Sequence, residues 1–240
     1  MMPDFSILFG DGGVLAPLRT LVEAGGAVVT LLLAMSVVTL ALVLAKAAQF
    51  AMIRVGNTRD VAAGLSAYRA GNPRQALAIL AASRNPAAQV AAGAIRELPA
   101  AGSRADLLRE EIGRRAAAEI EALRSHLRTI EVVATLSPLL GLFGTVLGMI
   151  DAFRAMEAAG SRVDPAVLSG GIWEALLTTA VGLAVAVPSV AAVNHFDRRV
   201  EQVTHLMEDA VTQVFTATIV PERPSEASDG AAQAAAAVHA

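Results

Sequence analysis

The chain has 240 residues, of which 55% are hydrophobic and only 17% are charged, with a net charge of −3 and a mean hydropathy of +0.55. A soluble domain of this size carries about a quarter charged residues, so this composition is atypical of a soluble globular protein. The sequence contains no cysteine, which excludes disulfide and thiolate chemistry.

Three long runs are free of charged residues: 24–45, 132–150 and 175–193. Each is close to the roughly 20 residues that an α-helix needs to cross about 30 Å of hydrocarbon. The alternative is a soluble, alanine-rich bundle, but three runs of this length are hard to hide from water in one small chain. The runs therefore predict three transmembrane helices. The stretch before the first run is more acidic than basic, which is unlike a cleaved signal peptide.

Lysine and arginine residues near the ends of membrane spans indicate which side is cytoplasmic. They are more frequent after the first run, before the second and after the third, and Trp173 falls at the opposite boundary, where an interfacial indole is favoured. We therefore expect an outer N-terminus and a cytoplasmic C-terminus. The predicted order is a short outer N-terminus (1–23), transmembrane helix (24–45), cytoplasmic helical domain (46–130), transmembrane helix (131–152), outer loop (153–171), transmembrane helix (172–193), cytoplasmic helix (194–220) and disordered tail (221–240).

The cytoplasmic region reads as helical, and the predicted fold is an all-α membrane protein whose long helices extend into a helical cytoplasmic domain. Breaks at Gly71-Asn72-Pro73 and at Asn85-Pro86 predict three short helices within 58–98. Apolar residues then recur every three or four positions through 103–130, and no helix breaker separates this stretch from the second span until Pro138. We expect one long helix there.

Beyond the third span, a second apolar stripe predicts core or subunit contact rather than a ligand site: Phe196, Val200, Val203, Met207, Val211 and Val214.

The second span carries a strip of small residues. Gly141, Gly144 and Gly148 lie three and four residues apart, which lets helix backbones approach closely in lipid. We expect the strip, with Gly182 of the third span, to pack helices and to hold copies of the chain together. Thr145 lies on the same side and is either bonded back to its own helix or part of the weakly polar wall of a pore. Prolines inside the second and third spans, Pro138 and Pro188, are expected to bend them.

Glu174 stands directly before the third uncharged run. It is either an interfacial acid at the positive end of a helix dipole or an ionisable group that faces a protein interior. Thr178, four residues on, shares its face, whereas Thr179 points further around the helix.

No motif for nucleotide binding, paired histidines or nucleophilic catalysis is present in the sequence, and its four histidines are scattered. We therefore expect no enzyme activity, no metal, no cofactor and no nucleic-acid partner.

Two segments, "SPLLGLFGTVLGMIDAF" and "GGIWEALLTTAVGLAVAVPSVAAVNHFDRRVE", together resemble the signature of the ExbB/TolQ/MotA proton-channel family. The resemblance, closest to ExbB and TolQ, implies a subunit of the bacterial inner membrane, with the outer side being the periplasm. By motif, Glu174 and Thr179 match the glutamate and threonine of the family's third helix, and Thr145 matches the threonine of its second. Thr178 stands where the family commonly has a small residue.

The resemblance also implies partners: a pentamer of this chain around single-span helices of an ExbD/TolR-type protein, which supplies an intramembrane aspartate, and a TonB or TolA-type protein that receives the work. The residues themselves indicate that a second chain is needed, because no other ionisable group lies at mid-depth in the three spans. Three functions stay open: energy conversion for TonB-dependent outer-membrane transport, TolQ-like service in the Tol-Pal envelope system, and a membrane scaffold without ion flow.

Overall fold

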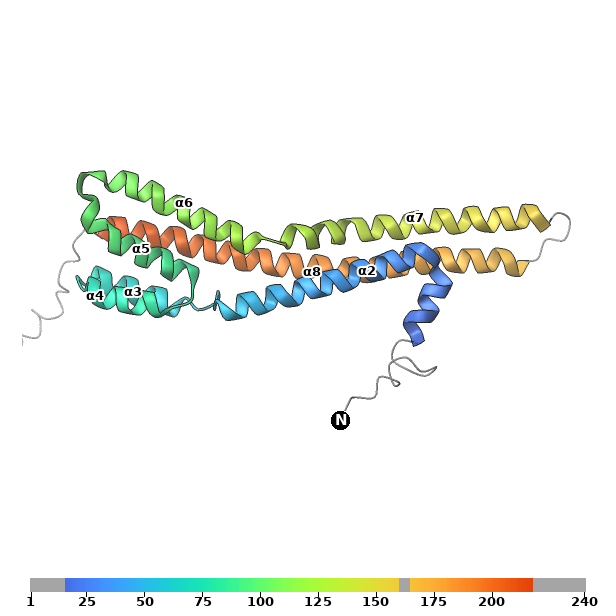
Figure 1. Ribbon diagram of the computed structural model, residues 1–240, viewed down its shortest axis with the longest axis horizontal. Coiled ribbons are helices and arrows are strands. Elements are labelled where there is room, and N and C mark those ends of the chain that lie inside the picture. The colour runs from blue at the N-terminus through green and yellow to red at the C-terminus, as the bar shows by residue number, and fades with distance from the viewer. Residues whose placement is uncertain (1–15, 160–164, 218–240) are drawn as a thin grey trace, which may run out of the picture. The chain divides into compact units, whose positions relative to one another are not determined.

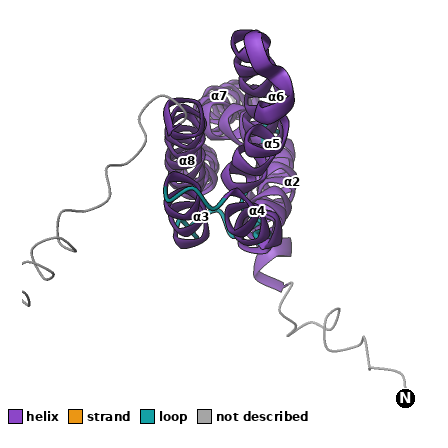
Figure 2. Cartoon of the chain, turned by 90° about the vertical axis from the view of Figure 1, so that its left-hand side faces the viewer, coloured by secondary structure: helices purple, strands orange, loops and turns teal. Residues whose placement is uncertain are grey.

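The computed structural model describes residues 16–159 and 165–217. Within these residues every regular element is a helix, joined by turns and short loops (Figures 1 and 2). The all-α membrane fold that the sequence predicts is confirmed. The predicted tail (221–240) lies outside the described residues, as do most of the predicted N-terminal segment and part of the predicted outer loop.

The chain divides into two compact units, Met1–Gln49 with Arg124–Arg198, and Phe50–Leu123 with Arg199–Ala240. We call the first the spanning unit and the second the helical domain. The elements in chain order are α2 (Ala16–Met52), α3 (Arg59–Arg69), α4 (Pro73–Ala82), α5 (Pro86–Ala101), the short 3-10 turn η1 (Gly102–Arg104), α6 (Ala105–Arg124), α7 (Leu127–Ala159) and α8 (Pro165–Ala217).

Three stretches of the described residues are long and apolar enough to cross a membrane: Gly25–Met52, Leu127–Ala158 and Leu168–Ala217. Most of each stretch belongs to the spanning unit. Nearly all of the large apolar side chains that are exposed among the described residues lie on these helices, including Leu40, Leu142 and Val187, which is 67% exposed. A surface of this kind is unfavourable in water, whereas lipid or another apolar chain covers it without penalty.

The predicted continuous helix from 103 into the second span is wrong. The helix is interrupted at Ser125 and His126, and His126 adopts a positive φ of 63°. Neither residue is a glycine or proline, so the sequence pattern gave no sign of a break. The apolar face was nevertheless correctly identified, since Ile112, Leu127 and Ile130 on it are all buried.

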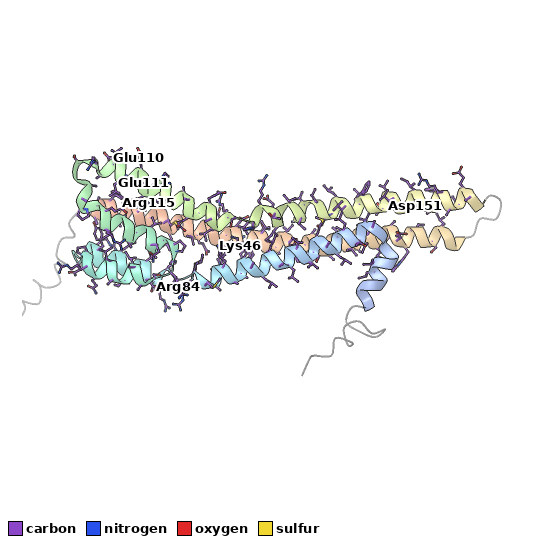
Figure 3. The ribbon with its side chains drawn as sticks, in the orientation of Figure 1. Lys46, Arg84, Glu110, Glu111, Arg115 and Asp151 are labelled. Atoms are coloured by element: carbon purple, nitrogen blue, oxygen red, sulfur yellow. The ribbon has the colours of Figure 1, made fainter. Side chains whose placement is uncertain are left out.

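Lys46 lies at this interruption, near the end of α2 (Figure 3). Its side chain is only 3% exposed, and its Nζ donates to Gln49 Oε1 at 2.8 Å and to Ser125 Oγ at 3.4 Å. Ser125 Oγ lies in turn 3.2 Å from His126 Nδ1. In the sequence, Lys46 is one of the basic residues that indicate which side of the membrane is cytoplasmic. In the structure it also ties α2 to the turn that precedes α7.

In the helical domain, the three predicted short helices occur as α3, α4 and α5, with breaks at the predicted glycine, asparagine and proline residues. The fully buried Asn85 joins their connections. Its Oδ1 accepts from Ala87 N at 2.9 Å and caps α5, while its Nδ2 donates to Asn57 O at 2.9 Å and to Val55 O at 3.4 Å. The predicted apolar stripe of α8 is buried from Phe196 to Val214, and the interpretation as core is confirmed.

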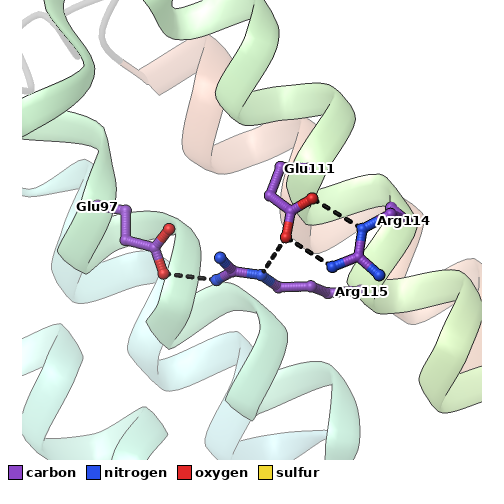
Figure 4. A network of polar contacts seen from close by, with 4 residues as sticks. All are labelled: Glu97, Glu111, Arg114 and Arg115. Atoms are coloured by element: carbon purple, nitrogen blue, oxygen red, sulfur yellow. Dashed lines mark hydrogen bonds and ion pairs between the residues drawn. The ribbon is translucent and has the colours of Figure 1, made fainter.

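Polar contacts between α5 and α6 lie on the surface of this domain (Figure 4). Arg115 bonds both Glu97 on α5 and Glu111 on α6, and Arg114 makes a bidentate contact with Glu111. Hydrogen bonds from Arg114 and Arg115 lower the pKa of Glu111 to about 2 from an ordinary value of 4.5. The stabilisation is therefore complete above pH 4.5 and lost as the pH falls toward 2, and it is small because the groups are exposed.

Replacing Asn85 with Leu tests its role in the helical domain. The change leaves two buried carbonyls and one helix N–H without their partner, so we expect the free energy of unfolding to fall by about 1–3 kcal/mol. Thermal unfolding of the purified chain measures this. The matched control is Asn72→Ala, because Asn72 also precedes a helix but makes no side-chain cap bond. Equal effects of the two substitutions would contradict the prediction.

Candidate functional site

The backbones of α7 and α8 touch where both helices carry glycine. A Cβ atom placed on Gly141 would lie 3.0 Å from Thr178 O and 3.4 Å from the Cα of Gly182. A Cβ on Gly182 would lie 2.6 Å from Ser137 O. These positions therefore have no room for a side chain, and the absence of one lets the two helices approach closely.

The contact continues along the rest of the glycine strip. A Cβ on Gly144 would fall 2.6 Å from Thr178 Oγ1, and one on Gly148 would fall 3.3 Å from the Cβ of Ala175. The strip is thus covered by α8 of the same chain. The expectation that the strip also holds copies of the chain together stays a prediction.

Two threonines of α8 bond to one carbonyl of α7. Thr178 Oγ1 and Thr179 Oγ1 each donate to Gly141 O at 3.2 Å, and Thr178 Oγ1 also lies 2.7 Å from Ala175 O. Thr178 is 2% exposed and Thr179 is half-buried. Sequence reasoning placed the two hydroxyls on different sides of the helix. The structure brings both to Gly141 because the missing side chain exposes that carbonyl.

Thr145 is placed differently. Its Oγ1 donates to Leu142 O at 2.6 Å, one turn back on the same helix, and the side chain is half-buried. None of the described hydrogen bonds joins it to Thr178 or Thr179. Of the two alternatives for this residue, the bond to its own helix is the one present in the structure.

Glu174 lies on α8 and reaches α2. The residue is half-buried, and its Oε1 is 3.3 Å from the point where a Cβ on Gly26 would lie. At Gly26 the backbone leaves the helical conformation, with φ 60° and ψ −151°. Sequence reasoning missed Gly26. The pair Gly25-Gly26 was the available signal, but it lies inside an uncharged run that reads as one uninterrupted helix.

Three further hydroxyls of the spanning unit are buried. Ser137 and Ser189 donate to carbonyls one turn back on their own helices, whereas Thr39 Oγ1 is buried and has no hydrogen-bond partner in the described protein. Pro138 and Pro188 lie inside α7 and α8, which continue through them. Their predicted bends stay predictions.

This arrangement places the Glu174 carboxyl group beside α2 and two threonine hydroxyls at the contact of α7 with α8. Between Glu174 and His195 the sequence of α8 has no ionisable residue, and the uncharged runs of α2 and α7 have none either. Among the described residues no cluster of His, Asp and Glu is placed to hold a metal ion. Glu174 is thus separated from the next ionisable residue of α8 by an uncharged run of the length that crosses about 30 Å of hydrocarbon.

Comparisons with known proteins match the part of the chain that carries Gly141 and Glu174. A model described as the MotA/TolQ/ExbB proton channel family matches residues 82–209, just over half of the chain. An ExbB-like biopolymer transport protein of Synechocystis sp. is 32% identical over 174 residues, which cover 72% of this chain and 81% of that protein.

Two further relatives match over shorter segments. The biopolymer transport protein exbB1 of Vibrio cholerae is 48% identical over 67 residues, covering 28% of this chain and 29% of the relative. The Tol-Pal system protein TolQ of Haemophilus influenzae is 41% identical over 85 residues, covering 35% and 37%. The chain thus spans well under half of these two relatives.

Gly144→Ala tests the close contact between α7 and α8. The new Cβ would lie within 2.7 Å of both Oγ1 and Cβ of Thr178, so we expect a loss of about 1–3 kcal/mol from overpacking. The double substitution Gly144→Ala with Thr178→Gly, which removes the side chain that the new Cβ meets, should recover part of that loss. Thermal unfolding in detergent measures both. Gly170→Ala is the control, because nothing lies within 4 Å of its Cβ position; a double variant no more stable than Gly144→Ala alone would argue against the contact.

Proposed function

The chain belongs to the MotA/TolQ/ExbB proton channel family, and on that premise we propose that it is a proton-channel subunit of the bacterial inner membrane. With an ExbD/TolR-type single-span partner, it converts the proton motive force into mechanical work for TonB-dependent transport at the outer membrane. The observation that supports this most is the placement of Glu174: a half-buried carboxyl group at the junction of two apolar helices.

The need for a partner follows from the same site. A proton that binds at Glu174 finds no second titratable group along the uncharged runs of this chain. An acid supplied by another helix, such as an intramembrane aspartate of the partner, completes the path. Water ordered by threonine hydroxyls can bridge short gaps, but it cannot replace a group that stores the proton.

The exposed apolar surface supports an assembly of several copies. Phe143 and Leu176 are more than half exposed, and each lies on a helix whose glycine-lined face is already covered within the chain. We propose that these outward faces contact lipid and neighbouring copies in a homo-oligomer, a pentamer by the family resemblance. The chain encloses the partner helices in that assembly.

A TolQ-like role in the Tol-Pal system is the second candidate, because TolQ and ExbB relatives match this chain at comparable identity. The two roles differ in the outer-membrane protein that receives the work and not in the proton-carrying site. Loss of siderophore-type uptake on deletion of this chain supports the TonB role, whereas loss of envelope integrity supports the Tol-Pal role. A chain that co-purifies with no single-span partner would be a scaffold without ion flow.

Glu174→Gln should abolish partner-dependent energy conversion, to the level of a strain that lacks the chain, while the complex still assembles. Gln keeps the shape and hydrogen-bonding capacity but cannot titrate. Glu174→Asp should retain partial activity because its carboxyl group is pulled back by one methylene, and Thr179→Val should be milder still. Proton-gradient-dependent uptake, in a strain whose only copy is the variant, measures the effect.

Glu157→Gln is the matched control, because Glu157 is an exposed acid of α7 with no place in the proposed path. If Glu174 is only an interfacial acid, Gln there removes a dipole contact on the order of 0.3–1 kcal/mol and leaves uptake intact. Wild-type uptake by Glu174→Gln at normal protein level would therefore refute the proposed role.

We also propose a periplasmic N-terminus and a cytoplasmic C-terminus, from the excess of lysine and arginine at one end of the spans. A reporter active only in the cytoplasm, fused after Ala240, should be active, and the same reporter inserted into the 153–171 segment should be silent. The reverse pattern at the two fusion points would overturn the orientation.

A further inference from the structure

The backbone conformation at Gly26 is one that only glycine adopts readily. Its φ of 60° with ψ of −151° lies in a region that is closed to residues with a Cβ, and such strain persists only where the surroundings fix it. Thr30 Oγ1 donates to Gly26 O at 2.9 Å, so the carbonyl is already oriented along the helix that follows. The interruption of α2 thus lies at the start of the membrane-crossing stretch Gly25–Met52 (Figure 1).

The space left by the missing side chain of Gly26 is next to the Glu174 carboxylate. Oε1 of Glu174 lies 3.3 Å from the Cβ position, which is closer than most real Cβ contacts. Gly25 has a different role, because a Cβ there would collide with Val29 of its own helix. The two adjacent glycines therefore have separate roles. Gly25 leaves room for Val29 of its own helix, and Gly26 leaves room for the carboxylate of Glu174.

Glu174 faces α2 while its neighbours face α7. Ala175 and Thr178 of α8 meet the glycine strip, which fixes the rotation of α8 about its axis. With that rotation fixed, the carboxylate of Glu174 reaches the interruption in α2. A broken helix also leaves backbone N–H groups without partners in the helix, so the surroundings are more polar there than beside an intact helix.

We propose that Gly26 is a positioning residue for Glu174: the interruption of α2 forms a recess that receives the carboxylate and holds it at the junction of α2 and α8. The consequence of this inference rests on the proposed function: proton transfer at Glu174 would require Gly26. The contact between Gly26 and Glu174 does not depend on that function.

Carboxyl footprinting with a water-soluble carbodiimide tests the recess. The full chain is labelled in its purified complex at one fixed pH, and the labelled residues are quantified by mass spectrometry. In the wild-type protein Glu174 should react several-fold more slowly than Asp151, whose side chain is 74% exposed. In Gly26→Ala the reaction at Glu174 should become several-fold faster, because the new Cβ displaces the carboxylate. Protection by lipid depth alone would leave the rate unchanged in Gly26→Ala, and that result would overturn the inference.

Two control variants separate contact from strain. Gly71→Ala places a Cβ at another positive φ, 78°, but nothing lies within 4 Å of it, so it should leave both labelling of Glu174 and uptake unchanged. Gly26→Ala should lower uptake several-fold, and adding Glu174→Asp should restore part of it, since the shorter acid withdraws from the new Cβ. No recovery in the double variant contradicts the contact.

The outcomes also separate this inference from the proposed function. Unchanged labelling and uptake in Gly26→Ala, with uptake lost in Glu174→Gln, refute the recess and leave the channel role standing. Faster labelling in Gly26→Ala, with full uptake in Glu174→Gln, supports the recess and refutes the channel role. If Gly26→Ala does not assemble, equal labelling rates of Glu174 and Asp151 in the wild-type protein still overturn the recess.

Discussion

Direct contact between the backbones of α7 and α8 is the constraint on which the spanning unit depends. Lipid tails are as apolar as leucine, so no hydrophobic force brings these helices together in a membrane, and close packing with inter-helix hydrogen bonds has to do so. Gly141 and Gly182 remove the side chains that would keep the backbones apart. The same contact fixes which face of α8 points to α7, and thereby directs Glu174 to α2.

The parts of this structure that the sequence predicts are those that one strong physical rule controls. The thickness of hydrocarbon sets the length of an uncharged helix, so three spans could be located from charge alone. Proline and glycine end helices for local reasons, and the breaks around Pro73 and Pro86 were therefore readable. The stripe from Phe196 to Val214 follows the helical period, and it is buried as that period requires.

The missed features depend on contacts between distant segments. His126 adopts a positive φ that no local signal announces, beside a serine that receives a bond from Lys46 of another helix. The role of Gly26 depends on the carboxylate of Glu174, nearly 150 positions further along the chain. Helical spacing alone also separated Thr178 from Thr179, because it takes no account of an exposed carbonyl on the neighbouring helix that both can reach.

The two hydrogen bonds that converge on the Gly141 carbonyl also limit the degrees of freedom of the spanning helices. A slide of α8 along α7, or a rotation about its own axis, would break both bonds and drive Thr178 into a neighbouring turn. Any rearrangement that keeps these bonds therefore moves α7 and α8 as one rigid body. The carboxyl group of Glu174 approaches α2 at one end and Lys46 bonds it to the turn before α7, while Val29 and Leu32 of α2 are fully buried.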